Sequence, residues 1–352
     1  KRRGEWTYWG YRPEPRTPNP TTWDRTEAIA TALDKALSDA PNRLAILRRM
    51  QREKLPIELN TLRNWLSVDH DSERVAAILV SLGSREASEI RDTLRGVIID
   101  AKYAVQDRQS ALQMLVDGLD AASESALLKI ASQVEDGEIA SRLIEQLGKR
   151  PKLASEPVLL AYLSSSNASV RSAAVSAMLG LGQNKSLRGH LSQLLNDPAA
   201  IVRRAAATAA GKFGAGDVVP ALRKLTGDDD ATVRRESLNS LRLLKDSTVV
   251  TAAVSALESE VTQIVAMRYL HEFGGPEQLE SISQVLRTNR SSEAIVVLIE
   301  TLAAWSEQDK GSRETGAQRE LLAAIAKVQG ESGWLLHWTL SDQPSEKTVL
   351  RS

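Results

Sequence analysis

A stretch of about thirty residues recurs along this chain, and its strongest copies carry a Val-Arg pair followed by small apolar residues. The pairs begin at Val170, Val202 and Val233, which gives steps of 32 and 31 residues. Self-similarity at such a period is typical of stacked supersecondary units, because each unit needs its neighbours to bury its apolar face. Weaker copies on both sides bring the expected total to roughly nine units. We therefore expect an all-α repeat array rather than one compact domain.

Each unit is predicted to contain two helices. In the clearest unit, the apolar residues from Val202 to Phe213 fall at helical spacing rather than in alternation. Asp197 is the expected N-cap, with Pro198 in the first turn, where a missing backbone N–H is tolerated. The glycines of residues 211–216 end this helix and lead into the second one. The unit is thus a helical hairpin.

The Asp/Asn and Val-Arg pattern resembles the HEAT family, including its short bacterial form, most specifically across residues 155–250. The resemblance implies a HEAT-type α-solenoid of roughly nine stacked helical hairpins. It also implies a ladder in which a turn residue of one unit pairs with an arginine of another, with Asn167, Asp197 and Asp229 or Asp230 as the turn partners. The third unit departs from the pattern, because Glu236 stands where an alanine is expected, so its packing or exposed face should differ. The candidate interaction or ladder residues are Arg171, Arg203, Arg204, Arg234, Arg235, Asp197 and Asp229.

The two ends of the chain differ from the repeats. Residues 1–22 are rich in aromatic residues and proline, so we expect an extended strap before a solenoid that spans residues 23–330. Residues 331–352 are expected to form a C-terminal cap or a linker to a following domain. The strap is expected to lie on the solenoid or to bridge to a preceding domain, and the tryptophans near the C-terminus either cap the stack or dock an adjoining domain. The candidate docking aromatics are Trp6, Trp9, Trp334 and Trp338.

A second resemblance rests on segments such as Gly4-Glu-Trp-Thr-Tyr-Trp-Gly-Tyr-Arg-Pro and Trp23-Asp-Arg-Thr-Glu-Ala-Ile. They resemble the HEAT region of very large secreted proteins from planctomycete-type bacteria, which carry a sugar-dehydrogenase-like propeller and a c-type haem domain. This resemblance implies a periplasmic or secreted location and adjoining domains in the same chain. The chain contains 0 Cys, so the haem-attachment motif is missing from these residues and no cofactor is assigned to them. The composition alone fits the cytoplasm equally well.

The sequence offers little catalytic chemistry. None of the four histidines lies three or four residues from another, so no helix face presents a pair of metal ligands. Residues 211–216 have the first spacing of a phosphate loop, but Asp217 follows where lysine is required. We assign no catalytic residue, metal or cofactor, and expect the protein not to be an enzyme.

Balanced charge, with 45 Lys plus Arg against 45 Asp plus Glu, disfavours nucleic acid as the partner, and no apolar run is long enough to span a membrane. We expect a protein-interaction scaffold or spacer module, with the second helix of each hairpin facing inward and its arginines offered to an anionic protein or polymer. Two alternatives remain open. One is a DNA-binding or glycosylase-like HEAT enzyme built around Trp65, Asp69 and Arg63. The other is a chromophore-lyase-like HEAT helper.

Overall fold

In the computed structural model, the chain consists of two units, Lys1–Gly118 and Leu119–Ser352. The structure describes residues 4–7, 10–13, 27–28, 31–32, 35–36, 40–53, 57–120, 123–182, 184–288, 291–308, 335–336 and 349–350.

The first unit consists of paired helices. Its helices are α2 (Ala40–Arg52), α3 (Leu59–Val68), α4 (Ser72–Leu82), α5 (Ala87–Ile99) and α6 (Val105–Asp117). Helices α2, α4 and α6 stack in sequence, while α3 packs on α4 and α5 packs on α6. Fully or nearly fully buried aliphatic side chains fill the space between the two layers, as helices with one apolar face require. They include Leu47, Leu62, Val75, Ile78, Leu82, Leu94 and Ile98.

A short hairpin lies at the start of the chain. Strand β1 (Gly4–Thr7) pairs with β2 (Gly10–Pro13) in antiparallel register, with Trp6 opposite Tyr11. The expected strap of residues 1–22 is therefore extended where the structure describes it, and it folds back on itself. Its other residues lie outside the described part of the chain.

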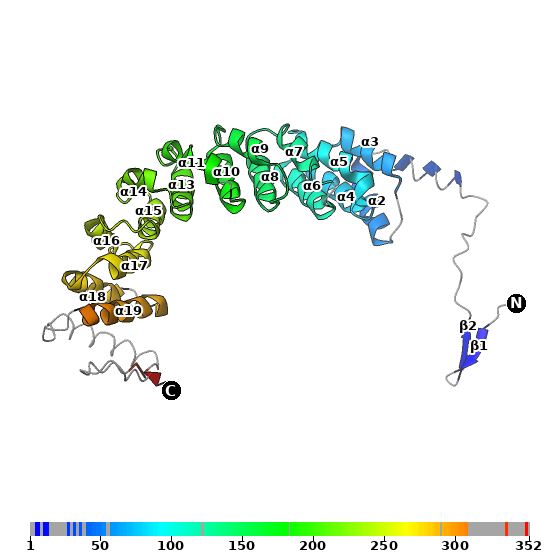
Figure 1. Cartoon of the computed structure of the whole chain (residues 1–352). Coiled ribbons are helices and arrows are strands. Elements are labelled where there is room, and N and C mark those ends of the chain that lie inside the picture. The colour runs from blue at the N-terminus through cyan, green and yellow to red at the C-terminus, as the bar shows by residue number, and fades with distance from the viewer. Residues whose placement is uncertain are drawn as a thin grey trace. The chain divides into compact units, whose positions relative to one another are not determined.

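The second unit has two layers of helices (Figure 1). Figure 1 shows one layer along the inner side of this unit's curve, and we call its members the inner helices. They are α8 (Glu138–Gly148), α10 (Ala168–Gly180), α13 (Ala200–Lys212), α15 (Ala231–Leu243), α17 (Gln263–Phe273) and α19 (Ser292–Gln308). The outer helices are α7 (Ala126–Ala131), α9 (Glu156–Tyr162), α11 (Asn184–Arg188), α12 (Leu191–Leu194), α14 (Val219–Leu225), α16 (Val250–Ala256) and α18 (Leu279–Thr288), with 3-10 turns at Gly216–Val218 and Pro276–Gln278.

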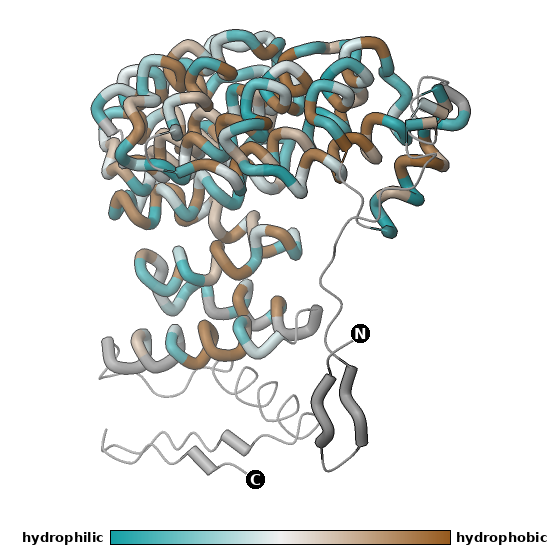
Figure 2. Tube along the Cα trace, turned by 90° about the vertical axis from the view of Figure 1, so that its right-hand side faces the viewer, coloured by the Kyte–Doolittle hydropathy of each residue, from teal (hydrophilic) through white to brown (hydrophobic). Residues whose placement is uncertain are grey.

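Consecutive inner helices pack directly on one another. Figure 2 shows brown apolar and teal polar residues alternating along the helices, as amphipathic helices buried on one side require. Small residues allow the closest approaches. A Cβ added to Gly148 would lie 2.9 Å from the Cα of Ala177, and one added to Gly211 would lie 2.8 Å from the Cα of Ser240. Glycine at these two positions lets neighbouring inner helices stack without a steric clash.

Within the described residues between 40 and 308, the chain thus forms helices stacked as an α-solenoid. The first unit stacks α2, α4 and α6, and the second unit stacks six inner helices. The predicted fold class is confirmed. No helix among the described residues is long and apolar enough to cross a membrane. Near the C-terminus, β3 (Leu335–Leu336) pairs with β4 (Val349–Leu350), and the other residues of the predicted cap, 331–352, lie outside the described part.

Candidate functional site

The turns that precede α10, α13 and α15 share one backbone arrangement with two side-chain positions. The first position lies five residues before the repeat valine and the second lies three before it. In every turn the side chain at the first position accepts the backbone N–H of the second, at 2.9 to 3.0 Å. The first positions are Ser165, Asp197 and Asp228, and the second positions are Asn167, Ala199 and Asp230.

The second position is the helix N-cap. Asn167 and Asp230 each accept two backbone N–H groups from the first turn of the following helix. Ala199 holds the same place before α13 without a side-chain acceptor. The prediction that Asp197 is an N-cap is therefore wrong. Its carboxylate lies two residues earlier and points toward the preceding unit.

In each of these turns, the Nη1 atom of one arginine donates hydrogen bonds to two backbone carbonyls, and we call this arrangement the arginine clasp. The Nη1 atom of Arg171 donates to the carbonyl oxygens of Ser165 and Ser166 at 2.9 and 3.1 Å. Arg203 and Arg234 repeat these two bonds on their own turns, at distances between 2.7 and 3.0 Å. The bonds fix the plane of the guanidinium group and leave its Nε and Nη2 edge pointing away from the turn.

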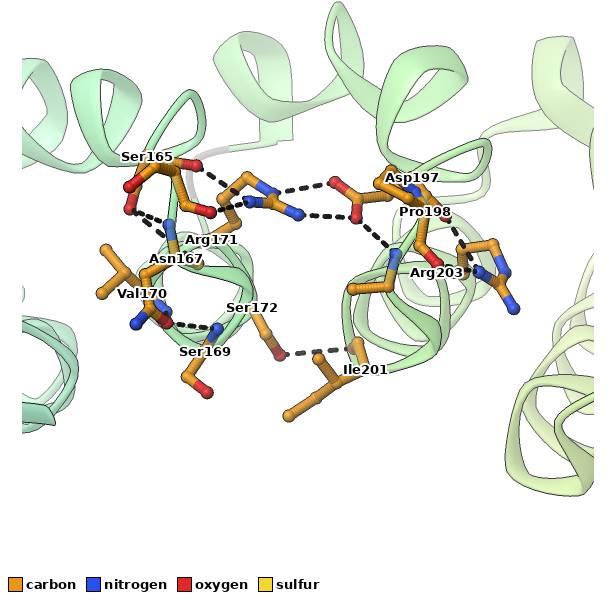
Figure 3. A network of polar contacts seen from close by, with 12 residues as sticks. Ser165, Asn167, Ser169, Val170, Arg171, Ser172, Asp197, Pro198, Ile201 and Arg203 are labelled. Atoms are coloured by element: carbon orange, nitrogen blue, oxygen red, sulfur yellow. Dashed lines mark hydrogen bonds and ion pairs between the residues drawn. The ribbon is translucent and has the colours of Figure 1, made fainter. Parts of the chain in front are cut away.

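Two of these edges bind the carboxylate of the next unit. Arg171 donates from Nε and Nη2 to Asp197 at 2.8 and 2.7 Å (Figure 3). Arg203 donates in the same way to Asp228, at 2.8 Å for both bonds. We call these two ion pairs the ladder. Bidentate pairs between guanidinium and carboxylate are among the strongest hydrogen bonds in proteins, and here all four side chains are largely buried.

The ladder holds its carboxylates in the ionised form. Burial opposes ionisation of Asp197, but hydrogen bonds from Arg171 and from the N–H of Ala199 outweigh it and lower the pKa of this carboxyl. The pKa of Asp228 is lowered for the same reasons, with burial again opposing the hydrogen bonds. Both acids therefore stay charged through the neutral range.

Two predicted turn partners are wrong. Asn167 caps α10 rather than pairing with an arginine of another unit, and the partner of Arg203 is Asp228 rather than Asp229 or Asp230. The spacing in sequence did not separate the ladder position from the cap position. Arg234 was expected in the ladder, but it bonds only the carbonyls of its own turn, and its Nε and Nη2 have no acceptor among the described residues.

The remaining candidate arginines lie on the exposed side of the inner helices, which we call the inner face. Arg235 pairs with Glu236, and Glu236 also accepts from Thr208 of the neighbouring α13 at 3.2 Å. The unusual glutamate therefore changes the exposed face, as the sequence indicated. Arg204 and Lys212 on α13 have no carboxylate partner among the described residues.

A turn of the same kind occurs in the first unit, where the repeat pattern is weaker in sequence. Asp69 accepts the N–H of Asp71 at 3.3 Å, and Asp71 caps α4. The Asp69 carboxylate also binds Arg43 at 3.0 Å and Arg74 at 2.6 Å. The missed signal is an Asp-x-Asp pair just before a helix, with an arginine 26 residues earlier.

The three residues suggested for a glycosylase-like site, Trp65, Asp69 and Arg63, are buried or bound to other residues of the chain. The ring of Trp65 is buried, with the Arg43 guanidinium 5.1 Å from its centroid. Arg63 points to α5, where it donates to Thr93 Oγ1 and to the carbonyl of Glu89. Because Asp69 is buried and bound by two arginines, it is not available to activate a water molecule or a sugar.

Of the candidate docking aromatics, only Trp6 is described, as part of β1, and the others lie outside the described residues. Within the described part of the chain, no group of three histidine or acidic side chains could hold a metal ion.

Residues 188–269 match the family of HEAT repeats. A search of curated proteins found no match to the chain. Among solved structures, YibA of Escherichia coli superposes with a TM-score of 0.52 at 17% identity, covering 82% of this chain and 99% of YibA. This likeness concerns the fold.

Two further structures superpose more loosely. An engineered protein gives a TM-score of 0.42 at 16% identity, covering 85% of this chain and 98% of its own. The complex of CpcE and CpcF of phycocyanin lyase from Nostoc gives 0.34 at 16% identity, covering 77% of this chain and 95% of its own. Superpositions this loose carry no argument about function.

Proposed function

We propose that this HEAT-repeat array is a non-catalytic scaffold whose inner face binds an acidic segment of a protein partner. The observation that carries the proposal is a pair of cations on α13. Arg204 and Lys212 take no part in the ion pairs of the ladder. Repeat arrays bind partners along extended surfaces of this kind.

The charges around these two cations leave room for an anionic ligand, because Glu236 on the α15 side is already paired with Arg235. The neighbouring helix α10 exposes Ser169 and Ser176 and contributes no charge to this part of the inner face. Arg204 and Lys212 are eight residues apart on one helix, so their side chains start about 12 Å from each other. A partner segment with acidic groups at a similar spacing would contact both. Arg171 and Arg203 do not belong to this surface because the ladder binds their guanidinium groups.

The test uses a fluorescein-labelled glutamate-rich peptide and the full chain, with binding measured by fluorescence anisotropy at low salt. The double variant Arg204→Glu and Lys212→Glu is expected to abolish binding. The matched control, Lys185→Glu and Lys224→Glu, makes the same charge change on the outer helices α11 and α14 and should leave affinity unchanged. Equal loss in both variants would show only non-specific attraction and would contradict the proposal.

A labelled duplex DNA of matched length tests the nucleic-acid alternative in the same assay. Binding of the duplex but not of the peptide would replace the acidic protein partner with DNA. The closed arrangement of Trp65, Asp69 and Arg63 gives that alternative no support.

We further propose that the scaffold is a spacer between domains of a larger extracytoplasmic redox protein. This part of the proposal rests on the resemblance of the segment that begins at Gly4. Capture of the native parent from cells with an antibody, followed by its mass and haem absorption, tests it. A mass well above 38.4 kDa with a c-type haem spectrum is expected, and a mass near 38.4 kDa without haem would rule out this part.

A further inference from the structure

The ladder ends at Arg234 with an open guanidinium edge. This arginine clasps its own turn through bonds of 2.7 and 3.0 Å from Nη1 to the carbonyls of Asp228 and Asp229, as Arg171 and Arg203 clasp theirs. In those two units the same clasp directs Nε and Nη2 onto an aspartate. At Arg234 both atoms lack an acceptor among the described residues, and the residue is half-buried rather than buried.

The missing acceptor has a sequence cause. The buried positions of α15 recur in α17 with a step of 29 residues, which makes Leu257 the equivalent of Asp228. The Leu257 side chain is buried, so it offers no acceptor where the ladder needs one. The equivalent buried positions are Ser237, Leu238, Ser240 and Leu241 in α15, and Ala266, Met267, Tyr269 and Leu270 in α17.

We propose that the open edge of Arg234 is a binding site for a carboxylate, the Asp or Glu side chain of a protein partner, which accepts from Nε and Nη2 as Asp197 and Asp228 do in the ladder. The edge is held in position before the ligand arrives, so binding does not have to order a flexible side chain. Its two N–H groups match the two oxygens of a carboxylate, as they do at Asp197 and Asp228.

The local charge favours a carboxylate over a phosphate. Asp229 and Asp230 belong to the turn that Arg234 clasps, and their negative charges repel a dianion more strongly than a monoanion. The site lies at the turn before α15 rather than at Arg204 and Lys212, so it does not depend on the proposed function.

Acetate is the probe. The full chain, labelled with ¹⁵N-arginine, is titrated with sodium acetate at about pH 6 while sodium chloride keeps the ionic strength constant, and the Nε–Hε signals are recorded. Arg234→Lys keeps the charge and identifies the signal. We expect the Arg234 signal to move in a saturable way, with a change several times larger than that of Arg204, while Arg203 stays fixed because Asp228 fills its edge.

Three outcomes would overturn the proposal. The first is an Arg234 signal that moves no more than that of Arg204. The second is a larger and tighter response to inorganic phosphate than to acetate. The third is a strong displacement of the Arg234 signal in the Glu258→Gln variant when no acetate is present. Such a displacement would show that the Glu258 carboxylate of the chain itself already binds the edge. The Arg204→Glu and Lys212→Glu variant should leave the acetate response intact, which separates this site from the inner face.

Discussion

Asp228 and Asp229 are adjacent acids with different roles. Asp228 is largely buried and accepts two bonds from Arg203 and one from the N–H of Asp230, whereas Asp229 makes no ladder contact. We predict that Asp228→Asn lowers the free energy of unfolding of the second unit by about 2 kcal/mol, because hydrogen bonds to a charged group are lost. Asp229→Asn should change it by less than about 0.5 kcal/mol. Urea titration followed by circular dichroism measures both, and equal losses would contradict the ladder assignment.

The ladder also predicts a pH dependence. The folded-state pKa of Asp228 lies below its unfolded value, so its contribution to stability is present above the unfolded pKa and is lost as pH falls through the folded pKa. The difference in urea midpoint between the wild type and Asp228→Asn should stay constant from about pH 7 to 5 and shrink below about pH 4. A difference that persisted in full at acid pH would show that the carboxylate charge contributes nothing.

The sequence shows which arginines recur, but it does not show where each acid points. Asp197 and Asp230 both precede a Val-Arg pair, yet one lies at the ladder position and the other at the cap position. The two positions differ by only two residues, and Asp suits both. Only the turn geometry, with the side chain of the first position bonded to the N–H of the second, separates them.

At the scale of the helices, glycine at a close contact predicts a sharp contrast. A Cβ on Gly211 would lie 2.6 Å from Ser240 Oγ, whereas one on Gly96 of α5 would meet nothing within 4 Å. Gly211→Ala should destabilise the second unit by about 1–3 kcal/mol through overpacking. Gly96→Ala should stabilise the first unit by about 0.5–1 kcal/mol, because alanine is the better helix former. Thermal unfolding of both variants checks this, and stabilisation by both would mean that α13 and α15 are not closely packed.

Helix α6 contains a buried acid that lacks one partner. Asp107 is 2% exposed, and only its Oδ1 is bonded, by Ser72. Burial raises the pKa of Asp107, the bond from Ser72 opposes this rise, and the charge of Asp71 adds to it. We predict that Asp107→Asn stabilises the first unit by about 1 kcal/mol at pH 7.

The contribution of Asp107 to stability should change with pH in the opposite direction to that of the ladder aspartates. Because the folded-state pKa of Asp107 is raised, the folded wild type binds the proton more tightly than the unfolded chain and gains stability as pH falls. The advantage of Asp107→Asn should therefore shrink as pH falls toward about 4. Urea midpoints of the two proteins across this range measure it, and a constant advantage would contradict burial of the charge.

The periodicity was sufficient to predict the helices, since apolar residues at helical spacing from Val202 to Phe213 correspond to α13 (Ala200–Lys212) and its C-cap. It was not sufficient to predict the close contacts. Gly211 reads as a helix-ending residue in sequence, but it lies inside α13 and is needed because Ser240 of the next inner helix lies against it. Such a contact involves residues of different units, so no pattern within one unit reveals it.

For the whole molecule, the division into Lys1–Gly118 and Leu119–Ser352 predicts two reporters that respond separately. Trp65 is buried in the first unit and Trp305 in the second. With fluorine-labelled tryptophan, ¹⁹F NMR in urea should show that Asp228→Asn shifts the transition of Trp305 and leaves that of Trp65 unchanged, because repeats couple mainly to their neighbours. Equal shifts would mean that the chain unfolds as one cooperative body.

The spacing of the ladder residues also determines which segment of the second unit can be deleted as one whole repeat. Asp197 and Asp228 are 31 residues apart and bind arginines of consecutive units in the same way. Removal of residues 197–227 would bring Asp228 to the place of Asp197, at the same separation of 26 residues from Arg171. The shortened chain should therefore fold with one hairpin fewer and an intact Arg171 pair, whereas removal of a few residues more or less would shift every side chain after the cut. In this sense the array is divisible only in whole units, and the arginine clasp marks where one unit ends and the next begins.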